Sequence, residues 1–278
     1  MKMTTPIWYL LPFIEEDAPF GDITSESLLD ERPVNAHILV KEDAVIAGLE
    51  EAVTLFSHFQ VTVEKLANDG NRVKTGTNIL KLYGNGKNIL LVERTALNII
   101  GRMSGIATKT AHYAEIIQSV NTKCKVAGTR KTAPGLRRLD KKAIVLGGGE
   151  PHRFGLSDGI LIKDNHLALA RLPESIQKCK AAYRYRKIEA EVEKPEDAVL
   201  AAQAGADIVM LDNMDPNQIR ETLSLLEKSG MRNRILLEIS GGINESTLQE
   251  YAKLDIDLIS VGALTHSVKN IDVSLEIT

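Results

Sequence analysis

Polar residues gather at the ends of a series of short apolar runs in the second half of the chain. In chain order, cationic residues follow the first two runs, carboxylates close the next two, and glycines follow the last two. In a β/α barrel, the catalytic groups are carried on the loops that follow the strands. We therefore treat these positions as one candidate site. The runs are residues 124–128, 160–163, 188–192, 208–211, 235–239 and 258–261.

The cationic residues at or beside these strand ends suit a substrate that carries two kinds of anionic group. Arginine pairs bidentately with carboxylates, and lysine acts as a point charge on phosphates. A histidine at position 152 could be a core residue or a general base. Its neighbour Arg153 favours a third interpretation, that His152 helps to bind an anion. The group consists of Arg130, Lys131, His152, Arg153 and Lys163.

Other cations of this segment have an ordinary explanation. Apolar residues repeat at helical spacing after Pro134 and stop at the three glycines of 147–149, which predicts a helix. Arg138, Lys141 and Lys142 are then expected to form a solvated face of that helix.

Two carboxylates, Glu191 and Asp212, each end an apolar strand, where an unpaired carboxylate is costly to remove from water. Mg²⁺ takes one or two protein carboxylates together with substrate phosphates, and ribose hydroxyls also need acceptors. The alternative is a structural ion pair with Lys163 or Lys131. The two interpretations are compatible, because an empty site of mixed charge would pair internally.

Two loops of small residues close the series, Ser240-Gly241-Gly242 and Gly262-Ala263. They are typical of the late loops of barrels that hold a phosphate on backbone N–H groups. A pair of tight turns is the alternative. Two such loops on neighbouring strands favour the phosphate site.

The elements that must position these residues fall into two parts. At about 150 residues per domain, a chain of 278 residues has room for about two domains. After residue 120, short strands alternate with helices, which forces parallel pairing and predicts a β/α barrel. The expected helices in this part are residues 195–204, 216–228 and 245–253.

The first part of the chain has the pattern of an α+β sandwich. Short β-type runs precede a helix at 49–58, and a hairpin is expected from residue 79 through the turn at 84–86 to residue 92. A helix with a break at Ser104-Gly105 is expected over residues 93–120.

The composition excludes several classes of protein. Lys and Arg number 34 against 37 Asp and Glu, and aromatic residues make up 4%, so nucleic acid is not an expected partner. No apolar run approaches the ~18 residues of a membrane span. The two cysteines form no C-x-x-C pair, which indicates a reducing compartment, and we expect a cytoplasmic protein. Serine-hydrolase, nucleotide-loop and zinc-protease motifs do not occur.

Several blocks spread over nearly the whole chain resemble the quinolinate phosphoribosyltransferase family, also called nicotinate-nucleotide pyrophosphorylase (carboxylating). Each block alone is weak, but their common order makes chance resemblance negligible. The blocks are 21–24 (GDIT), 93–98 (ERTALN), 104–108 (SGIAT), 129–132 (TRKT), 134–137 (PGLR), 147–149 (GGG), 152–153 (HR), 162–166 (IKDNH), 211–213 (LDN) and 261–267 (VGALTHS).

The resemblance implies an α/β protein with an N-terminal α/β sandwich domain, residues 1–110 completed by 267–278, and an incomplete seven-stranded α/β barrel, residues 111–266. The residue pattern yields six strands, so the seventh is either missed by the pattern or irregular. The implied enzyme is a type II phosphoribosyltransferase. It transfers the phosphoribosyl group of phosphoribosyl pyrophosphate to quinolinate with decarboxylation, which gives nicotinate mononucleotide, pyrophosphate and CO₂ in NAD biosynthesis.

The resemblance also implies roles for individual residues. Quinolinate is expected to be bound by Arg94 of a partner subunit, in a homodimer or larger homo-oligomer, and by Arg130, His152, Arg153 and Lys163. Phosphoribosyl pyrophosphate is expected at Lys131, Glu191, Asp212, Ser240, Gly241, Gly242, Gly262, Ala263 and His266. The catalytic residues are expected to be Lys131, Lys163, Glu191 and Asp212, with Mg²⁺ held by Glu191 and Asp212, directly or through water.

The chain departs from the family at three positions, Gly128, Pro151 and Lys142, where many members have Asp, Asn and Tyr. None of the three is an expected ligand. The alternatives are a phosphoribosyltransferase for nicotinate, a relative associated with molybdenum transport, and a non-catalytic protein that binds the same ligands. The full set of anion ligands speaks against the second, and the presence of both Glu191 and Asp212 speaks against the third.

Overall fold

The computed structural model describes residues 4–278, and this part of the chain divides into two compact units. The sandwich unit comprises the residues up to 111 together with 132–148 and 264–278. The barrel unit comprises residues 112–131 and 149–263. The fold is thus mixed α/β, with a sheet-containing N-terminal part and a C-terminal part of parallel strands, as predicted.

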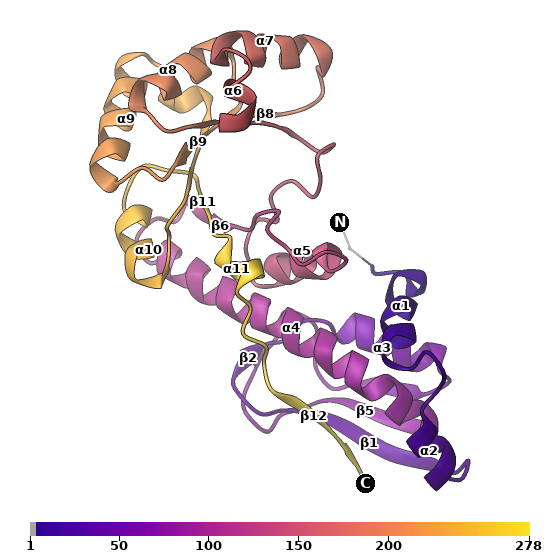
Figure 1. Cartoon of the computed structure of the whole chain (residues 1–278). Coiled ribbons are helices and arrows are strands. Elements are labelled where there is room, and N and C mark those ends of the chain that lie inside the picture. The colour runs from indigo at the N-terminus through magenta and orange to yellow at the C-terminus, as the bar shows by residue number, and fades with distance from the viewer. Residues whose placement is uncertain (1–3) are drawn as a thin grey trace. The chain divides into compact units, whose positions relative to one another are not determined.

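The sandwich unit is built on a four-stranded antiparallel sheet in the order β12-β1-β5-β3. The last strand of the chain pairs with β1, so the C-terminal segment completes this sheet (Figure 1). Its strands are β1 (Pro33–Val40), β3 (Thr62–Lys65), β5 (Asn78–Asn85) and β12 (Val273–Ile277), and β2 (Ala44–Val45) pairs separately with β4 (Arg72–Val73). Its helices are α1 (Ile7–Asp17), α2 (Ile23–Leu28), α3 (Leu49–His58) and α5 (Arg137–Leu146), and α4 (Gly86–Gln118) begins in it.

The core of this unit lies between the sheet and the helices. Alternate residues of β1 and β5 point inward, and Ile38 and Leu80 are fully buried there. Phe56 of α3 and Ile89 of α4 are also fully buried in this cluster. Burial of such side chains stabilises the unit by about 1.5–3 kcal/mol each.

The predicted hairpin from residue 79 to residue 92 is wrong, because β5 is followed directly by a 33-residue helix, α4. The side chain of Asn85 accepts a hydrogen bond from the backbone N–H of Lys87 at 2.9 Å, as a helix-capping residue does. The turn-forming residues at 84–86 therefore begin a helix instead of reversing a strand.

The predicted helix break at Ser104-Gly105 is also wrong, because α4 is continuous there. A Cβ on Gly105 would lie 2.1 Å from the carbonyl oxygen of Lys269. The glycine lets the C-terminal segment pass against the helix, which is a packing role.

The predicted solvated face of α5 is wrong at Lys141 and Lys142, both of which are buried. The Lys142 Nζ lies 2.8 Å from Glu50 Oε2, 2.9 Å from Glu51 Oε1 and 3.7 Å from Asp69 Oδ2. Carboxylates on neighbouring elements thus compensate a cation that the local sequence gives no reason to bury.

The barrel unit contains six parallel strands in the order β6-β11-β10-β9-β8-β7, and helices surround them (Figure 1). All six strands lie where the sequence predicts them, and the helices predicted at 195–204 and 216–228 have the predicted bounds. The strands are β6 (Lys125–Ala127), β7 (Ile160–Ile162), β8 (Ile188–Val192), β9 (Ile208–Asp212), β10 (Leu236–Ser240) and β11 (Leu258–Ser260). The helices are α6 (Asp164–Leu167), α7 (Leu172–Ala182), α8 (Pro195–Ala204), α9 (Pro216–Lys228), the 3₁₀ turn η1 (Arg232–Arg234), α10 (Glu245–Ala252) and α11 (Ala263–His266), the last of which ends in the sandwich unit.

The irregular seventh strand is reduced to one residue. Glu150 forms a parallel bridge with Ala127 of β6, and its N–H donates to the carbonyl of Val126 at 2.9 Å. Pro151 follows, and a proline has no N–H with which to continue a ladder. The barrel is therefore incomplete, with β6 and β7 as the edges of the six-stranded sheet.

Within residues 4–278, no helix has the length and apolar character that a membrane crossing requires.

Candidate active site

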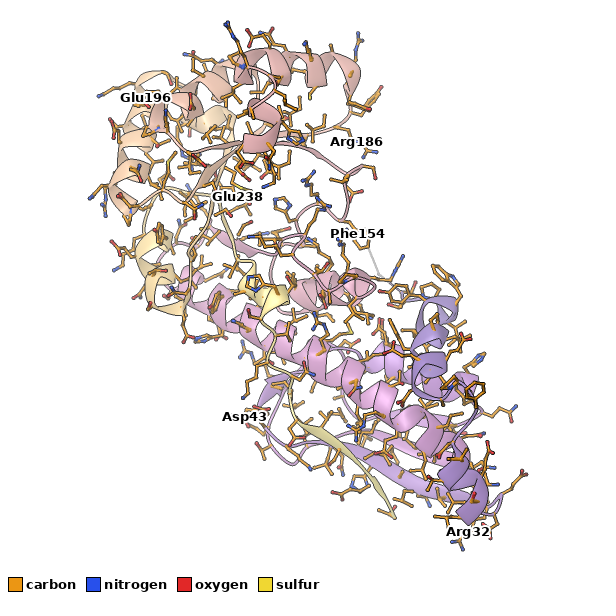
Figure 2. All side chains as sticks on the ribbon, in the orientation of Figure 1. Arg32, Asp43, Phe154, Arg186, Glu196 and Glu238 are labelled. Carbon is orange, nitrogen blue, oxygen red and sulfur yellow. The ribbon has the colours of Figure 1, made fainter. Side chains whose placement is uncertain are left out.

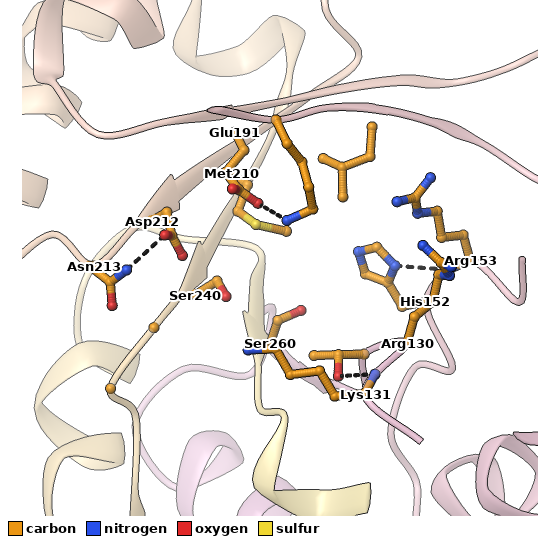
Figure 3. Close-up of a pocket in the computed structure, with 15 residues that line it drawn as sticks. Arg130, Lys131, His152, Arg153, Glu191, Met210, Asp212, Asn213, Ser240 and Ser260 are labelled. Atoms are coloured by element: carbon orange, nitrogen blue, oxygen red, sulfur yellow. Dashed lines mark hydrogen bonds and ion pairs between the residues drawn. The ribbon is translucent and has the colours of Figure 1, made fainter. Parts of the chain in front are cut away.

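A cavity of about 530 Å³ lies at the carboxyl ends of the barrel strands (Figure 3). The structure brings together in its lining most of the residues that the sequence singled out: Arg130, Lys131, His152, Arg153, Lys163, Glu191, Asp212, Ser240, Gly241 and Gly242. Thr129 and Asn213 also line it, and both lie in blocks that carry the family resemblance without an assigned role. The remaining lining residues, which the sequence did not single out, are Leu161, Met210 and Ser260.

The acidic side of the pocket lies on β8 and β9. The Glu191 side chain is 11% exposed, and its Oε2 contacts the Lys163 Nζ in an ion pair. Asp212 Oδ2 accepts a hydrogen bond of 2.7 Å from the amide of Asn213. One of the two ion pairs considered from the sequence is therefore present, at Glu191. Both carboxylates line the same cavity, as a Mg²⁺ site shared with substrate phosphates requires.

The basic side of the pocket carries two arginines, Arg130 and Arg153. Burial and the charge of Arg130 both lower the pKa of Arg153, and Glu189 and Asp158 oppose this effect. The Arg153 Nη1 donates to the carbonyl of Gly159 at 3.2 Å, and the buried Arg130 Nε has no hydrogen-bond partner among the described residues. Two guanidinium groups so placed favour an anion between them.

The loop after β10 approaches the loop after β9 closely. Gly241 has φ +94°, and a Cβ there would lie 2.1 Å from Asn213 Oδ1. Gly242 also has a positive φ, +64°, but its Cβ direction is open. Gly241 is thus required for packing between the two loops, while Gly242 leaves backbone uncovered at the pocket.

Four predicted site residues do not line the pocket. Gly262 and Ala263 follow β11 in the barrel unit, at the carboxyl end of that strand. Arg94, exposed on α4, and His266, exposed at the end of α11, belong to the sandwich unit. His266 Nδ1 lies 2.8 Å from the hydroxyl of its neighbour Ser267.

Two buried carboxylates that were not predicted from the sequence lie beside His152. The His152 Nε2 lies 3.4 Å from Glu189 Oε2 and 3.4 Å from Glu238 Oε1. Ser260 donates its hydroxyl to Glu238 Oε1. Each glutamate lies two residues before a pocket residue on its strand, Glu191 or Ser240, and therefore on the same face. That spacing is the signal that could have found them.

Protonation of this cluster follows from its geometry. The Arg153 N–H donates to His152 Nδ1 at 2.9 Å, which assigns the ring proton to Nε2. Burial lowers the pKa of His152, but the two glutamates outweigh it and raise that pKa to about 9. Burial also raises the pKa of Glu189. The two glutamates therefore favour the protonated His152 ring, and in the neutral ring the hydrogen bond from Arg153 leaves the proton on Nε2.

The same cluster is the one group of His, Cys, Asp and Glu residues in the described chain whose ligand atoms approach as a metal site would. Its three ligand atoms, one each from His152, Glu189 and Glu238, lie within 4.8 Å of one another. The Nε2 proton already occupies the space between the carboxylates.

Models of one protein family match nearly the whole chain. The family model described as the quinolinate phosphoribosyl transferase N-terminal domain matches residues 22–104, and the C-terminal domain model matches residues 106–276.

Two relatives are both called "probable nicotinate-nucleotide pyrophosphorylase [carboxylating]". The protein of Methanothermobacter thermautotrophicus is 42% identical over 267 residues, covering 95% of this chain and 96% of its own. The protein of Bacillus subtilis is 38% identical over 96% of this chain and 91% of its own.

Solved structures show the same similarity. The nicotinate-nucleotide pyrophosphorylase of Francisella tularensis superposes with a TM-score of 0.92 at 33% identity, covering 100% of this chain and 99% of that one. The NadC structure of Streptococcus pyogenes has a TM-score of 0.91 at 36% identity, with coverage of 99% and 98%.

Proposed function

Since the chain belongs to the quinolinate phosphoribosyl transferase family, we propose that it transfers the phosphoribosyl group of phosphoribosyl pyrophosphate to quinolinate and releases CO₂. The products are nicotinate mononucleotide and pyrophosphate. The observation that carries the proposal is one cavity with paired arginines on one side and paired carboxylates beside a glycine loop on the other. Such a lining suits a dicarboxylate next to a phosphorylated sugar.

Quinolinate is assigned to the basic side of the pocket. Arg130 and Arg153 pair with its carboxylates, and Lys163 adds a charge at the end of β7. The 3-carboxylate survives in the product and the 2-carboxylate leaves as CO₂. Strong binding of the leaving 2-carboxylate would stabilise the ground state and slow its loss as CO₂. The bidentate arginine contact is therefore assigned to the 3-carboxylate.

The phosphoribosyl donor is assigned to the other side. Glu191 and Asp212 accept from ribose hydroxyls or metal-bound water, Lys131 lies at the pyrophosphate, and Ser240, Gly241 and Gly242 offer hydrogen bonds to phosphate. Gly262, Ala263 and His266 keep the same assignment as a proposal. When bound at Glu191 and Asp212, Mg²⁺ neutralises charge on the pyrophosphate.

The reaction needs positioning more than acid–base help. The quinolinate nitrogen carries its own lone pair and attacks the anomeric carbon of ribose as the bond to pyrophosphate breaks. The new pyridinium ring then holds the electron pair that CO₂ leaves at C2, and a proton replaces CO₂ there. The protein orients the two substrates and balances their charge.

Completion of the quinolinate site by a second subunit is part of the proposal. Arg94 is exposed on α4, where a partner subunit can receive it. In a mixed dimer, an Arg94→Ala chain combined with a Lys163→Ala chain recovers part of the activity if the two residues meet across the interface. A verified mixed dimer without recovery would count against sharing.

The test of the function is an assay of the purified protein with quinolinate, phosphoribosyl pyrophosphate and Mg²⁺. Nicotinate mononucleotide and labelled CO₂ are followed together, with nicotinate as the parallel substrate. We expect equal amounts of both products from quinolinate and little product from nicotinate. Product from nicotinate alone would identify the protein as a phosphoribosyltransferase for nicotinate. No product from either substrate would favour the non-catalytic protein that binds the same ligands.

A further inference from the structure

Both ring nitrogens of His152 face groups of the protein itself. The Arg153 N–H donates to Nδ1, and Nε2 faces Glu189 and Glu238. His152 lines the pocket, yet in this arrangement neither nitrogen is directed at a ligand there. Its contribution to the site must therefore come from something other than a direct hydrogen bond to the substrate.

The segment that carries His152 has little support from secondary structure. Glu150 makes a single bridge to β6, and residues 151–159 contain no helix or strand. His152 has φ 57°, a left-handed conformation that strains a residue with a Cβ. Such a conformation persists only where its surroundings hold it. The contacts of the ring with β8 and β10 supply that hold.

The conformation at His152 sets the direction of Arg153, the next residue. We propose that Glu189 and Glu238 are positioning residues of the quinolinate site, which hold the His152 ring, fix the left-handed turn and so direct the Arg153 guanidinium into the pocket. The inference rests on the proposed function, in which Arg153 binds a substrate carboxylate.

Glu189 and Glu238 act from outside the substrate pocket. Their side chains are 6% and 0% exposed, and they line a second cavity of about 620 Å³ at the amino ends of the strands. His152 and Arg153 line both cavities. In Figure 2, Glu238 lies among the strands of the barrel unit, whereas Glu196 lies on the outside at α8. The two glutamates therefore reach a ligand in the pocket through His152 and Arg153, and Glu238 also contacts the pocket residue Ser260.

The test uses Glu238→Gln, which removes the charge and keeps the shape of the side chain. Phthalate serves as the probe because it carries the two adjacent carboxylates of quinolinate but lacks the reacting nitrogen. We expect the Kd of phthalate and the KM of quinolinate to rise about tenfold or more, since misplacement by about 1 Å has effects of this size. The KM of phosphoribosyl pyrophosphate should change by less than about twofold.

The matched control is Glu150→Gln. Glu150 lines the same second cavity but pairs with Lys125 at 2.7 Å, so this variant should bind phthalate as the wild type does. A cycle with His152→Ala tests the route. If Glu238 acts through His152, the effects of the two substitutions are not additive. The Kd of phthalate for the double variant Glu238→Gln/His152→Ala should then not exceed the higher of the two single-variant values.

Unchanged phthalate affinity in Glu238→Gln overturns the proposal, and so does an equal rise in the KM of both substrates, which marks a general defect. If Glu238→Gln does not fold, Glu189→Gln takes its place with the same expectations. Failure of the proposed function looks different, because the wild type would then bind phthalate without releasing CO₂ from quinolinate. A wild type that does not bind phthalate overturns the positioning role.

Discussion

Lys163 and Glu191 form an ion pair at the carboxyl ends of the neighbouring parallel strands β7 and β8. The lysine side chain is 42% exposed, while the glutamate side chain is 11% exposed. The pocket thus balances one of its cations internally before any substrate is present. In the proposed reaction, quinolinate would share Lys163 with Glu191, and the two substrates would then lie side by side.

Replacement of Lys163 by alanine removes this shared cation. We expect Lys163→Ala to lower kcat/KM for quinolinate. The decrease should correspond to a loss of about 2–5 kcal/mol in transition-state binding, because the substitution also leaves Glu191 without its partner. Steady-state kinetics measure the effect. Lys187→Ala is the control, since Lys187 pairs with Asp207 at the amino end of β8 and is 76% exposed. Equal losses in both variants would contradict the assignment.

The arginines of the basic side should be sensitive to shape as well as charge. Arg130→Ala and Arg153→Ala should each cost about 2–5 kcal/mol in transition-state binding of quinolinate. Arg153→Lys should restore only part of the loss, because lysine cannot pair bidentately with a carboxylate. Steady-state kinetics with quinolinate measure this, and unchanged kcat/KM in both alanine variants would remove the carboxylate assignment.

The sequence predicted regular elements well, since their patterns are local. Strand β8 and helices α8 and α9 have the predicted bounds, because apolar periodicity and an N-terminal proline mark them. The start of α4 was missed, because a glycine-rich turn and a capping asparagine look alike in sequence. The buried Lys142 was missed, because its carboxylate partners lie on segments about 70 or more positions away.

The residues of the candidate site also fall into those that local sequence patterns predict and those that they do not. Residues at strand ends, such as Glu191 and Asp212, were found because the barrel topology brings all strand ends together. Glu189 and Glu238 were missed because an acidic residue inside an apolar strand has no local partner in sequence. Only the fold brings His152 to them, from the segment that replaces the seventh strand.

Gly241 offers a test of the proposed phosphate contact at the loop after β10. In Gly241→Ala the new Cβ would meet Asn213 Oδ1, so the loops after β9 and β10 must separate. We expect the KM of phosphoribosyl pyrophosphate to rise more than that of quinolinate, as measured by varying each substrate in turn. Gly230→Ala is the control, because Gly230 also has a positive φ, +70°, but a Cβ there would have no atom within 4 Å. This variant should leave both KM values close to those of the wild type. A similar rise in both variants would point to backbone strain alone.

His152 should make stability depend on pH. Its pKa is raised from 6.5 to about 9 in the folded protein by Glu189 and Glu238, against the effect of burial. The contribution is therefore complete below pH 6.5 and is lost as pH rises through 9. Its size is on the order of 3 kcal/mol. Urea unfolding at several pH values should show this decline in the wild type. His152→Gln should lack it, and an identical decline in the variant would rule out His152 as its source.

The buried cluster around Lys142 should matter more to stability than exposed ion pairs of the same unit. Lys142→Met leaves Glu51 and Asp69 buried without their cation, and we expect a loss of about 3 kcal/mol in the free energy of unfolding at pH 7. Burial raises the pKa of Asp69, so protonation of this carboxylate should make the loss smaller at pH 5.

The control for that loss is Lys74→Met. Lys74 pairs with Asp43 at 2.6 Å on the surface of the same unit, where its side chain is 86% exposed (Figure 2 labels Asp43). Removal of such a pair costs about 1 kcal/mol or less, because water solvates both charges once they separate. Urea unfolding of the two variants compares the sites directly. Equal losses in the free energy of unfolding for Lys142→Met and Lys74→Met would mean that water already reaches the Lys142 cluster. The cluster would then stabilise the packing of α5 against α3 no more than an exposed ion pair does.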